Sequence, residues 1–194
     1  MTMLVILAVL AAIGLYVVMA YNGLVDRRNK VKNAFAQIDV QLTRRHDLIP
    51  NLVESVKGYM QHERATLEAV TAARKQAVSG LEAAAARPGD PAAMRQLASA
   101  EAALEGALGR LLAVVEAYPD LKADENMLRL QEELSSTENK VSFARQGYND
   151  AVMDYNTACE SFPTNLIAGA FQFEEAEFLE IESDAKREVP AVSF

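Results

Sequence analysis

The sequence contains one cysteine and two histidines among its 194 residues, and this scarcity excludes several common chemistries. Cys159 has no partner for an intrachain disulfide, which fits a reducing compartment. No histidine stands near it in the sequence. Because it falls on an apolar stripe, it is interpreted as a buried structural thiol rather than a nucleophile.

The sequence also lacks the patterns that metal and phosphate chemistry need. His62-Glu63 begins like a zinc metalloprotease motif, but no second histidine follows four residues after the first. Both His46 and His62 are therefore interpreted as surface or hydrogen-bonded side chains rather than zinc ligands. The nine glycines are scattered and form no phosphate-binding loop. We predict no catalytic residue, no metal site and no cofactor, and expect that the protein is not an enzyme.

None of the first 25 residues is charged. An apolar run of this length crosses a hydrocarbon core of about 30 Å as one helix. The alternative is a cleaved signal peptide, since Val18-Met19-Ala20 resembles a cleavage site, but no basic segment precedes the run and it exceeds a typical signal core. A buried core helix is disfavoured because no other segment is apolar all round and could enclose it. We predict a retained anchor over residues 1–25.

Positive charge follows this run at once and is absent before it. Four basic residues stand within seven positions: Arg27, Arg28, Lys30 and Lys32. The positive-inside rule places the N-terminus outside and the following domain in the cytoplasm, where anionic lipid headgroups would attract these residues. No long basic stripe exists, so no nucleic-acid partner is expected. The acidic charge gathers instead in the tail, at residues 174–188.

After the anchor, apolar residues recur every three or four positions, which predicts helices almost throughout. Pro50 predicts a kink or short break around Asp47–Pro50, after which the second helix runs to Arg87. Asp90 before Pro91 predicts the cap of the next helix, and Asp120 can cap the one that follows. The expected fold is all-α: a transmembrane helix, an antiparallel bundle of long helices (residues 26–161) and a Phe-rich C-terminal arm (residues 162–194).

Three sets of residues are candidates for interaction with a partner. Arg45 falls close to the apolar stripe, so it needs an acid such as Glu63, Glu138 or Asp154, either within the bundle or in a second protomer. The Tyr-Asn pairs beginning at Tyr148 and Tyr155 are seven residues apart and share one helix face; they are core tyrosines with hydroxyl partners at the bundle edge, or a recognition face. The arm is a flap on the bundle or a docking segment for another protomer. Together the candidates are Arg44, Arg45, Asp47, Pro50, Tyr148, Tyr155, Phe162, Phe171, Phe173 and Phe178.

Ordered motifs along the whole chain resemble those of the LemA family. They include residues 21–25 (YNGLV), 38–42 (IDVQL), 47–53 (DLIPNLV), 118–122 (YPDLK), Tyr148-Asn149, Tyr155-Asn156, Phe162-Pro163 and residues 190–194 (PAVSF). The resemblance implies a bacterial inner-membrane protein with an N-terminal membrane helix, a long helical domain and no established catalytic residues. One magnetosome-formation protein belongs to the group. Members are often encoded beside a membrane metalloprotease, which makes such a protease a possible partner.

Two functions follow from these observations. The first is a membrane-anchored, ring-like homo-oligomeric scaffold that contacts membrane lipids, in which the tail 162–194 bridges neighbours. The basic segment 26–64 and the acidic segment 174–188 are complementary, and contacts between unlike surfaces generate rings when the rotation closes. The second is an adaptor or regulator of a membrane metalloprotease in membrane-protein quality control. Particle size in mild detergent separates the two.

Overall fold

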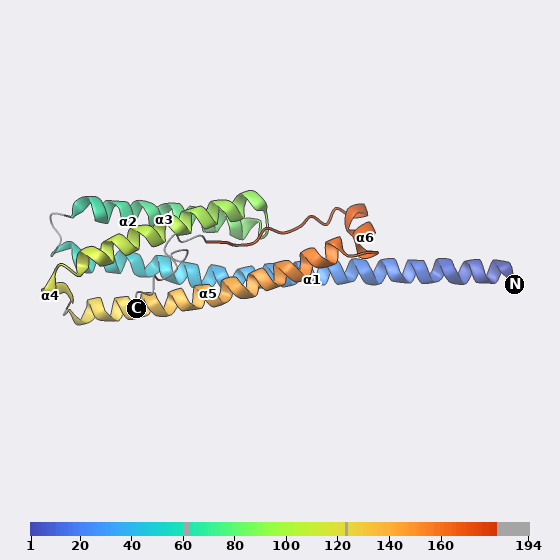
Figure 1. Ribbon diagram of the computed structural model, residues 1–194, viewed down its shortest axis with the longest axis horizontal. Helices are drawn as coiled ribbons and strands as arrows, with labels where there is room; N and C mark the ends of the chain where they lie inside the picture. Colours follow the sequence, from blue (N-terminus) through green and yellow to red (C-terminus); the bar gives the residue numbers. More distant parts are fainter. Residues whose placement is uncertain (60–62, 123, 182–194) are drawn as a thin grey trace, which may run out of the picture.

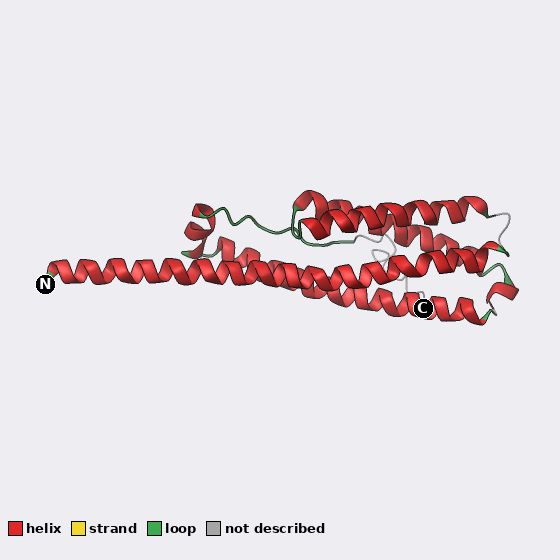
Figure 2. Cartoon of the chain, turned by 180° about the vertical axis from the view of Figure 1, so that it is seen from behind, coloured by secondary structure: helices red, strands yellow, loops and turns green. Residues whose placement is uncertain are grey.

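The computed structural model describes residues 1–59, 63–122 and 124–181. Within these ranges the chain forms six helices and no strand. In order they are α1 (Thr2–Lys57), α2 (Arg64–Ala86), α3 (Pro91–Val115), α4 (Pro119–Lys122), α5 (Glu125–Glu160) and α6 (Thr164–Ala170). The N-terminal part of α1 projects alone beyond an elongated bundle (Figures 1 and 2). The predicted all-α fold with a long apolar first helix is confirmed.

Helix α1 runs without interruption from the apolar run into the bundle. Its apolar window is long enough to cross a membrane, and none of that window is buried among the described residues. The segment Asn22-Gly23 does not interrupt it, because a lone glycine costs a helix only about 1 kcal/mol relative to alanine. The prediction that the anchor continues into the first bundle helix without a loop is therefore confirmed.

Of the two alternatives expected at Asp47–Pro50, a kink or a short break, the break is wrong, because α1 continues through Pro50 and ends at Lys57. A proline at position 50 has no N–H to donate to the carbonyl four residues earlier, that of His46. In the structure this carbonyl accepts a hydrogen bond of 2.6 Å from Nε of Arg74 on α2 instead. The side chain of a neighbouring helix thus supplies the donor that the proline lacks.

The bundle consists of two antiparallel helix pairs joined through α1. Helix α5 packs along α1, α2 packs along α3, and α1 also contacts α2. The second pair approaches closely because its interface is built from small residues: a Cβ added at Gly80 would lie 3.3 Å from Cα of Leu97. Its buried alanines are Ala73, Ala77, Ala84, Ala93, Ala100 and Ala107.

Two of the expected helix caps can be checked directly. Asp90 caps α3 by accepting from the amide of Ala93 at 2.9 Å, and Pro91 takes the first helical position, so this prediction is confirmed. The cap predicted at Asp120 is not the cap of the last long helix. Asp120 lies in the first turn of the short helix α4, and the side chain of Asp124 caps α5.

Candidate functional site

A cluster of charged side chains lies in the middle of the bundle, where α1 meets α3 and α5. The Arg45 guanidinium contacts Glu101 on α3 and, at 2.5 Å, Glu138 on α5. His46 Nε2 donates to the other oxygen of Glu101 at 2.8 Å. Arg45, His46 and Glu101 are buried, whereas the Glu138 side chain is 45% exposed. We call Arg45, His46, Glu101 and Glu138 the polar hub.

The polar hub separates two apolar cores. The core nearer the apolar helix includes Phe35 and Leu42 of α1, and the far core begins on the same helix with Ile49 and Leu52. Arg45 and His46 stand between them. Because buried charges need partners in one geometry, the hub fixes how α1 is rotated and positioned against α3 and α5.

The charges within the hub shift the pKa values of its members. Burial alone would lower the pKa of the Arg45 guanidinium, but the charges of Glu101 and Glu138 outweigh burial and raise it. Burial alone would raise the pKa of the Glu101 carboxyl, but the hydrogen bond from His46 and the charge of Arg45 hold it below its usual value. Both groups are thus held charged near neutral pH, which suits a structural ion pair better than proton transfer.

The hub identifies the acids that pair with Arg45, which the sequence left open. Glu138, one of the three expected acids, is its partner, and the interpretation as a pair within the bundle is confirmed. Asp154 pairs with Arg27 at 3.2 Å instead. The second acid, Glu101, was missed. Its signal was present, because it occupies a core position in the stripe of Leu97, Leu104 and Leu108 on α3.

The other residues of this motif lie at the surface of α1. Arg44, Asp47 and Pro50 are exposed, and Asp47 lies 3.9 Å from Arg74. His46 is a buried, hydrogen-bonded histidine, as one of its two interpretations had it, and His62 lies outside the described residues. Among the described residues no group of three or more His, Cys, Asp or Glu side chains is placed to hold a metal ion.

A second polar feature joins α5 to the C-terminal arm. Tyr155 and Tyr148 donate from their hydroxyls to the carbonyls of Glu174 (2.9 Å) and Glu177 (2.8 Å). Asn156 pairs both polar atoms of its amide with the backbone of Ala176, and Asn149 does the same with Leu179. We call these four side chains the clamp and the extended residues 174–179 the strap.

The clamp fits the strap because seven residues of helix and three residues of extended chain have nearly the same length. Seven residues of α-helix rise about 10.5 Å. Three residues of extended chain span about 10 Å. The strap runs antiparallel to α5. Moving seven residues forward on α5, from Tyr148 to Tyr155, therefore moves the contact three residues back on the strap, from Glu177 to Glu174. The interpretation of Tyr148 and Tyr155 as core tyrosines with partners at the bundle edge is confirmed, and burial raises the pKa of both.

The strap also contacts the turn between α2 and α3. The amide of Glu177 donates to the carbonyl of Gly89 at 3.0 Å, and its carboxylate pairs with Arg95 at 3.1 Å. Gly89 has a φ of +88°, and a Cβ added to it would lie 3.0 Å from Cβ of Ala176. A glycine is therefore required where the strap passes.

The arm between α5 and the strap lies against α1. Phe173 is buried, contacts Tyr21 edge to face and lies 5.0 Å beneath the Arg28 guanidinium. Phe171 also contacts Tyr21, at 5.0 Å between ring centres. The flap interpretation thus describes residues 164–181. The prediction that the arm bridges protomers stays a prediction, and residues 182–194 lie outside the described part of the chain.

Cys159 behaves as its sequence position indicated. It is buried at the end of α5 beside Tyr155, and burial raises the pKa of its thiol. A raised pKa leaves less of the nucleophilic thiolate at neutral pH. The interpretation as a structural cysteine is consistent with this environment.

The fold and these two polar features define a class: an all-helical, membrane-associated protein in which one candidate membrane helix continues directly into a bundle. The model of the LemA family matches residues 34–194. The chain therefore belongs to the LemA family, as its motifs indicated.

Individual relatives agree with this membership. The chain is 26% identical over 180 residues to the magnetosome protein MamQ 2 of Paramagnetospirillum magneticum, covering 84% of this chain and 65% of the relative. It is 26% identical over 174 residues to Protein LemA of Metamycoplasma hominis, covering 86% of this chain and 75% of the relative. The chain thus spans slightly less than two thirds of the length of this MamQ relative. None of these names is that of an enzyme.

Proposed function

We propose that this protein is a membrane-anchored, non-enzymatic scaffold that assembles into homo-oligomers at the bacterial inner membrane, with its bundle in the cytoplasm. The continuity of α1 carries the proposal. From Asp26 to Lys57 the helix extends about 48 Å beyond the apolar run. Because the polar hub fixes its rotation, the bundle stands on the anchor as one rigid unit, which is what a scaffold needs. The names of the MamQ relatives, which are magnetosome proteins, fit a role in membrane organisation.

The outer face of α5 is the surface best suited to contact a second copy. Phe143 is 81% exposed at its centre. Five exposed residues around it are uncharged, namely Ser135, Ser136, Asn139, Ser142 and Gln146, and the exposed charged residues Lys140 and Asp150 lie beside them. Interfaces are depleted in charge at their centre and enriched in aromatic side chains, which often supply much of the binding energy. We call Phe143 and these five residues the α5 face.

Anchoring restricts how two such faces can meet. Both apolar helices must enter the same membrane from the same side, so the two copies are related by an axis along the membrane normal. In a two-fold arrangement each α5 face meets its own copy at the same height, and the two Phe143 side chains approach each other. Confinement to a membrane raises the effective concentration of the copies and favours such a contact.

Disulfide cross-linking tests this arrangement in the full-length protein. Cys159 is replaced by serine, and Phe143→Cys is compared with Val40→Cys. Val40 is the matched control because it is also exposed and lies at the same height along the bundle as Phe143. The height follows from the antiparallel run of α1 and α5, in which Arg45 lies opposite Glu138. We expect a cross-linked dimer with Phe143→Cys in native membranes and none with Val40→Cys. Equal cross-linking of both variants, or of neither, contradicts the proposed contact.

Particle size and labelling test the remaining parts of the proposal. We expect a discrete oligomer by mass photometry in mild detergent and in lipid discs. A monomer that co-purifies with a membrane protease would instead favour the adaptor. The orientation is tested with a reporter cysteine near Gly89 in the Cys159→Ser background. A membrane-impermeant maleimide is expected to label it only after the inner membrane is opened.

A further inference from the structure

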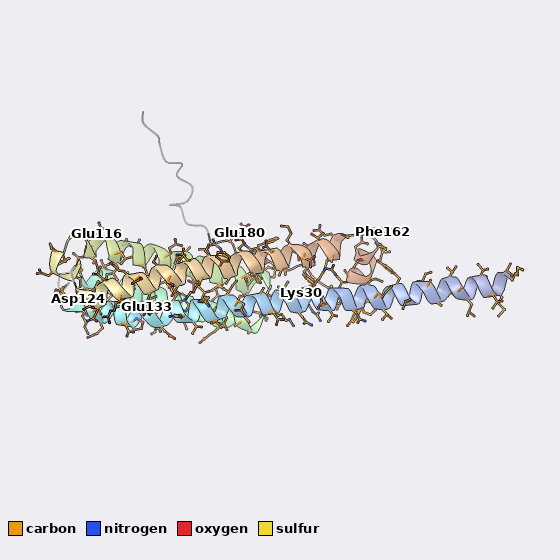
Figure 3. The ribbon with its side chains drawn as sticks, turned by 90° about the horizontal axis from the view of Figure 1, so that it is seen from below. Lys30, Glu116, Asp124, Glu133, Phe162 and Glu180 are labelled. Carbon is orange, nitrogen blue, oxygen red and sulfur yellow. The ribbon has the colours of Figure 1, made fainter. Side chains whose placement is uncertain are left out.

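The short helix α6 lies beside the apolar part of α1, and Phe173, which follows it, contacts Arg28 where the charged part begins. The hydroxyls of Tyr16 and Thr164 are 3.3 Å apart, and Phe171 contacts Tyr21. Figure 1 shows α6 alongside α1, and Figure 3 shows Phe162 at the end of the bundle nearest the projecting helix, with Glu116 and Asp124 at the far end. We call residues 161–173, which include α6, the foot.

The foot has the composition of a membrane-contacting segment. None of its residues is charged, although Glu160 precedes it and Glu174 follows it. Three of its large apolar side chains are more than half exposed: Phe162 is 80% exposed, Leu166 62% and Phe171 53%. In water these three large apolar side chains would be exposed together on one short segment, and large exposed apolar areas often mark contact with a partner or a membrane.

The position of the foot along α1 identifies what covers these side chains. Asp26 is the first charged residue of α1, and four basic residues follow it. These side chains mark the level of the lipid headgroups. Tyr21 lies about 8 Å before Asp26 along the helix axis and Tyr16 about 15 Å before it. Tyr21 is thus on the hydrocarbon side of the charges, at the depth of about 5–10 Å at which interfacial segments bury their apolar faces, and Tyr16 is deeper. The last residue of the foot, Phe173, returns to the level of the charges, where it lies beneath Arg28.

We propose that the foot inserts into the cytoplasmic leaflet and buries Phe162, Leu166 and Phe171 among lipid chains, as a second membrane contact beside the α1 anchor. The occupant of this surface is the bilayer itself, because the surface is continuous with the span. The inference rests on the proposed anchoring of α1. It adds that the bundle cannot tilt freely relative to the membrane, since the foot holds one side of it in the bilayer.

The chain contains no tryptophan, so single tryptophans report their surroundings without background. Three full-length variants are compared in lipid discs with and without lipids brominated on their acyl chains. Phe162→Trp reports on the foot, Leu10→Trp on the anchor, and Tyr59→Trp on the far end of α1, where Tyr59 is exposed. Each variant is first required to unfold at the temperature of the unmodified protein, and Phe171→Trp replaces Phe162→Trp if that variant does not.

We expect brominated lipid to remove most of the fluorescence of Phe162→Trp and of Leu10→Trp, and to leave that of Tyr59→Trp unchanged. Quenching of Leu10→Trp without quenching of Phe162→Trp overturns the foot while the anchor stands. In that case a blue-shifted but unquenched Phe162→Trp indicates that protein covers it. Absence of quenching in both variants overturns the anchoring as well as the foot.

Discussion

Arg74 donates to the His46 carbonyl, which lacks its usual helical donor because residue 50 is a proline, and this contact leads to a prediction about stability. Replacing Arg74 by methionine keeps its apolar stem but removes the donor of the 2.6 Å hydrogen bond to the His46 carbonyl. Because residue 50 is a proline, no backbone N–H can take its place. A hydrogen bond involving a charged group contributes about 1.5–3 kcal/mol, and an unpaired buried carbonyl costs a similar amount. We therefore expect Arg74→Met to lower the free energy of unfolding by about 2 kcal/mol.

The background with Pro50→Ala provides the decisive comparison. Alanine restores the backbone N–H at position 50, so the His46 carbonyl regains its ordinary partner four residues later along α1. In this background Arg74→Met should cost less than about 1 kcal/mol, because the carbonyl is no longer left without a donor. The coupling between the two substitutions is then about 1–2 kcal/mol, well above the scatter of about 0.5 kcal/mol seen for independent sites.

Thermal unfolding followed by circular dichroism in one detergent measures all four proteins of this cycle. For a chain of this length, 1 kcal/mol corresponds to about 2–4 °C, so Arg74→Met should lower Tm by about 4–8 °C. Asp47→Asn is the control for the ion pair of 3.9 Å, and its exposed carboxylate should contribute less than about 1 kcal/mol. If the effects of Pro50→Ala and Arg74→Met add within the scatter, Arg74 does not replace the missing donor.

Three further predictions concern the hub and the turns. Glu101→Gln should lower the free energy of unfolding by about 3–5 kcal/mol because it leaves Arg45 buried with one acid. Because the pKa of Glu101 is lowered in the fold, its stabilisation is present at neutral pH and is lost as the pH falls below about 4, so in pH-dependent melts the variant should lose less stability on acidification than the unmodified protein. Gly89→Ala should lower Tm, since it combines a φ of +88° with a contact to the strap, whereas the same change at the open position Gly106 should raise Tm slightly. Asp124→Ala should cost about 1 kcal/mol in the same assay, and Asp120→Ala less, because only Asp124 caps α5.

The periodicity of the sequence predicted the helices well because each helix buries one stripe of apolar side chains. The helix boundaries were predicted where a local signal decides them, as at Asp90-Pro91, where a cap and a proline coincide. The short break, one of the two alternatives expected at Pro50, was wrong for a reason that no local pattern contains. The donor that rescues the helix is Arg74, which belongs to a different helix.

The polar hub could be predicted in part from the sequence. The burial of Arg45 followed from its place beside an apolar stripe, and Glu138 was among its expected partners. Glu101 was visible as an acid at a core position of α3, but only the folded structure shows that its carboxylate contacts both Arg45 and His46 of α1.

The clamp shows a different limit. The repeat of Tyr-Asn after seven residues was visible on α5, but its partners are backbone groups of residues 174–179. Backbone groups are the same in every residue, so side-chain types could not identify them. The match between seven helical residues and three extended ones becomes a signal only once one of the two segments is known to be extended.

The hub, the foot and the α5 face together constrain how the proposed scaffold can assemble. A lateral contact between copies repeats only if every copy presents the same surface at the same height and in the same direction. The hub prevents α1 from turning within the bundle, because Arg45 and His46 are bonded to α3 and α5. The foot, in turn, would limit the tilt of the bundle relative to the membrane. Phe143 would then project at one height and in one direction relative to the bilayer, so the loss of either restraint should weaken the contact without altering the α5 face itself.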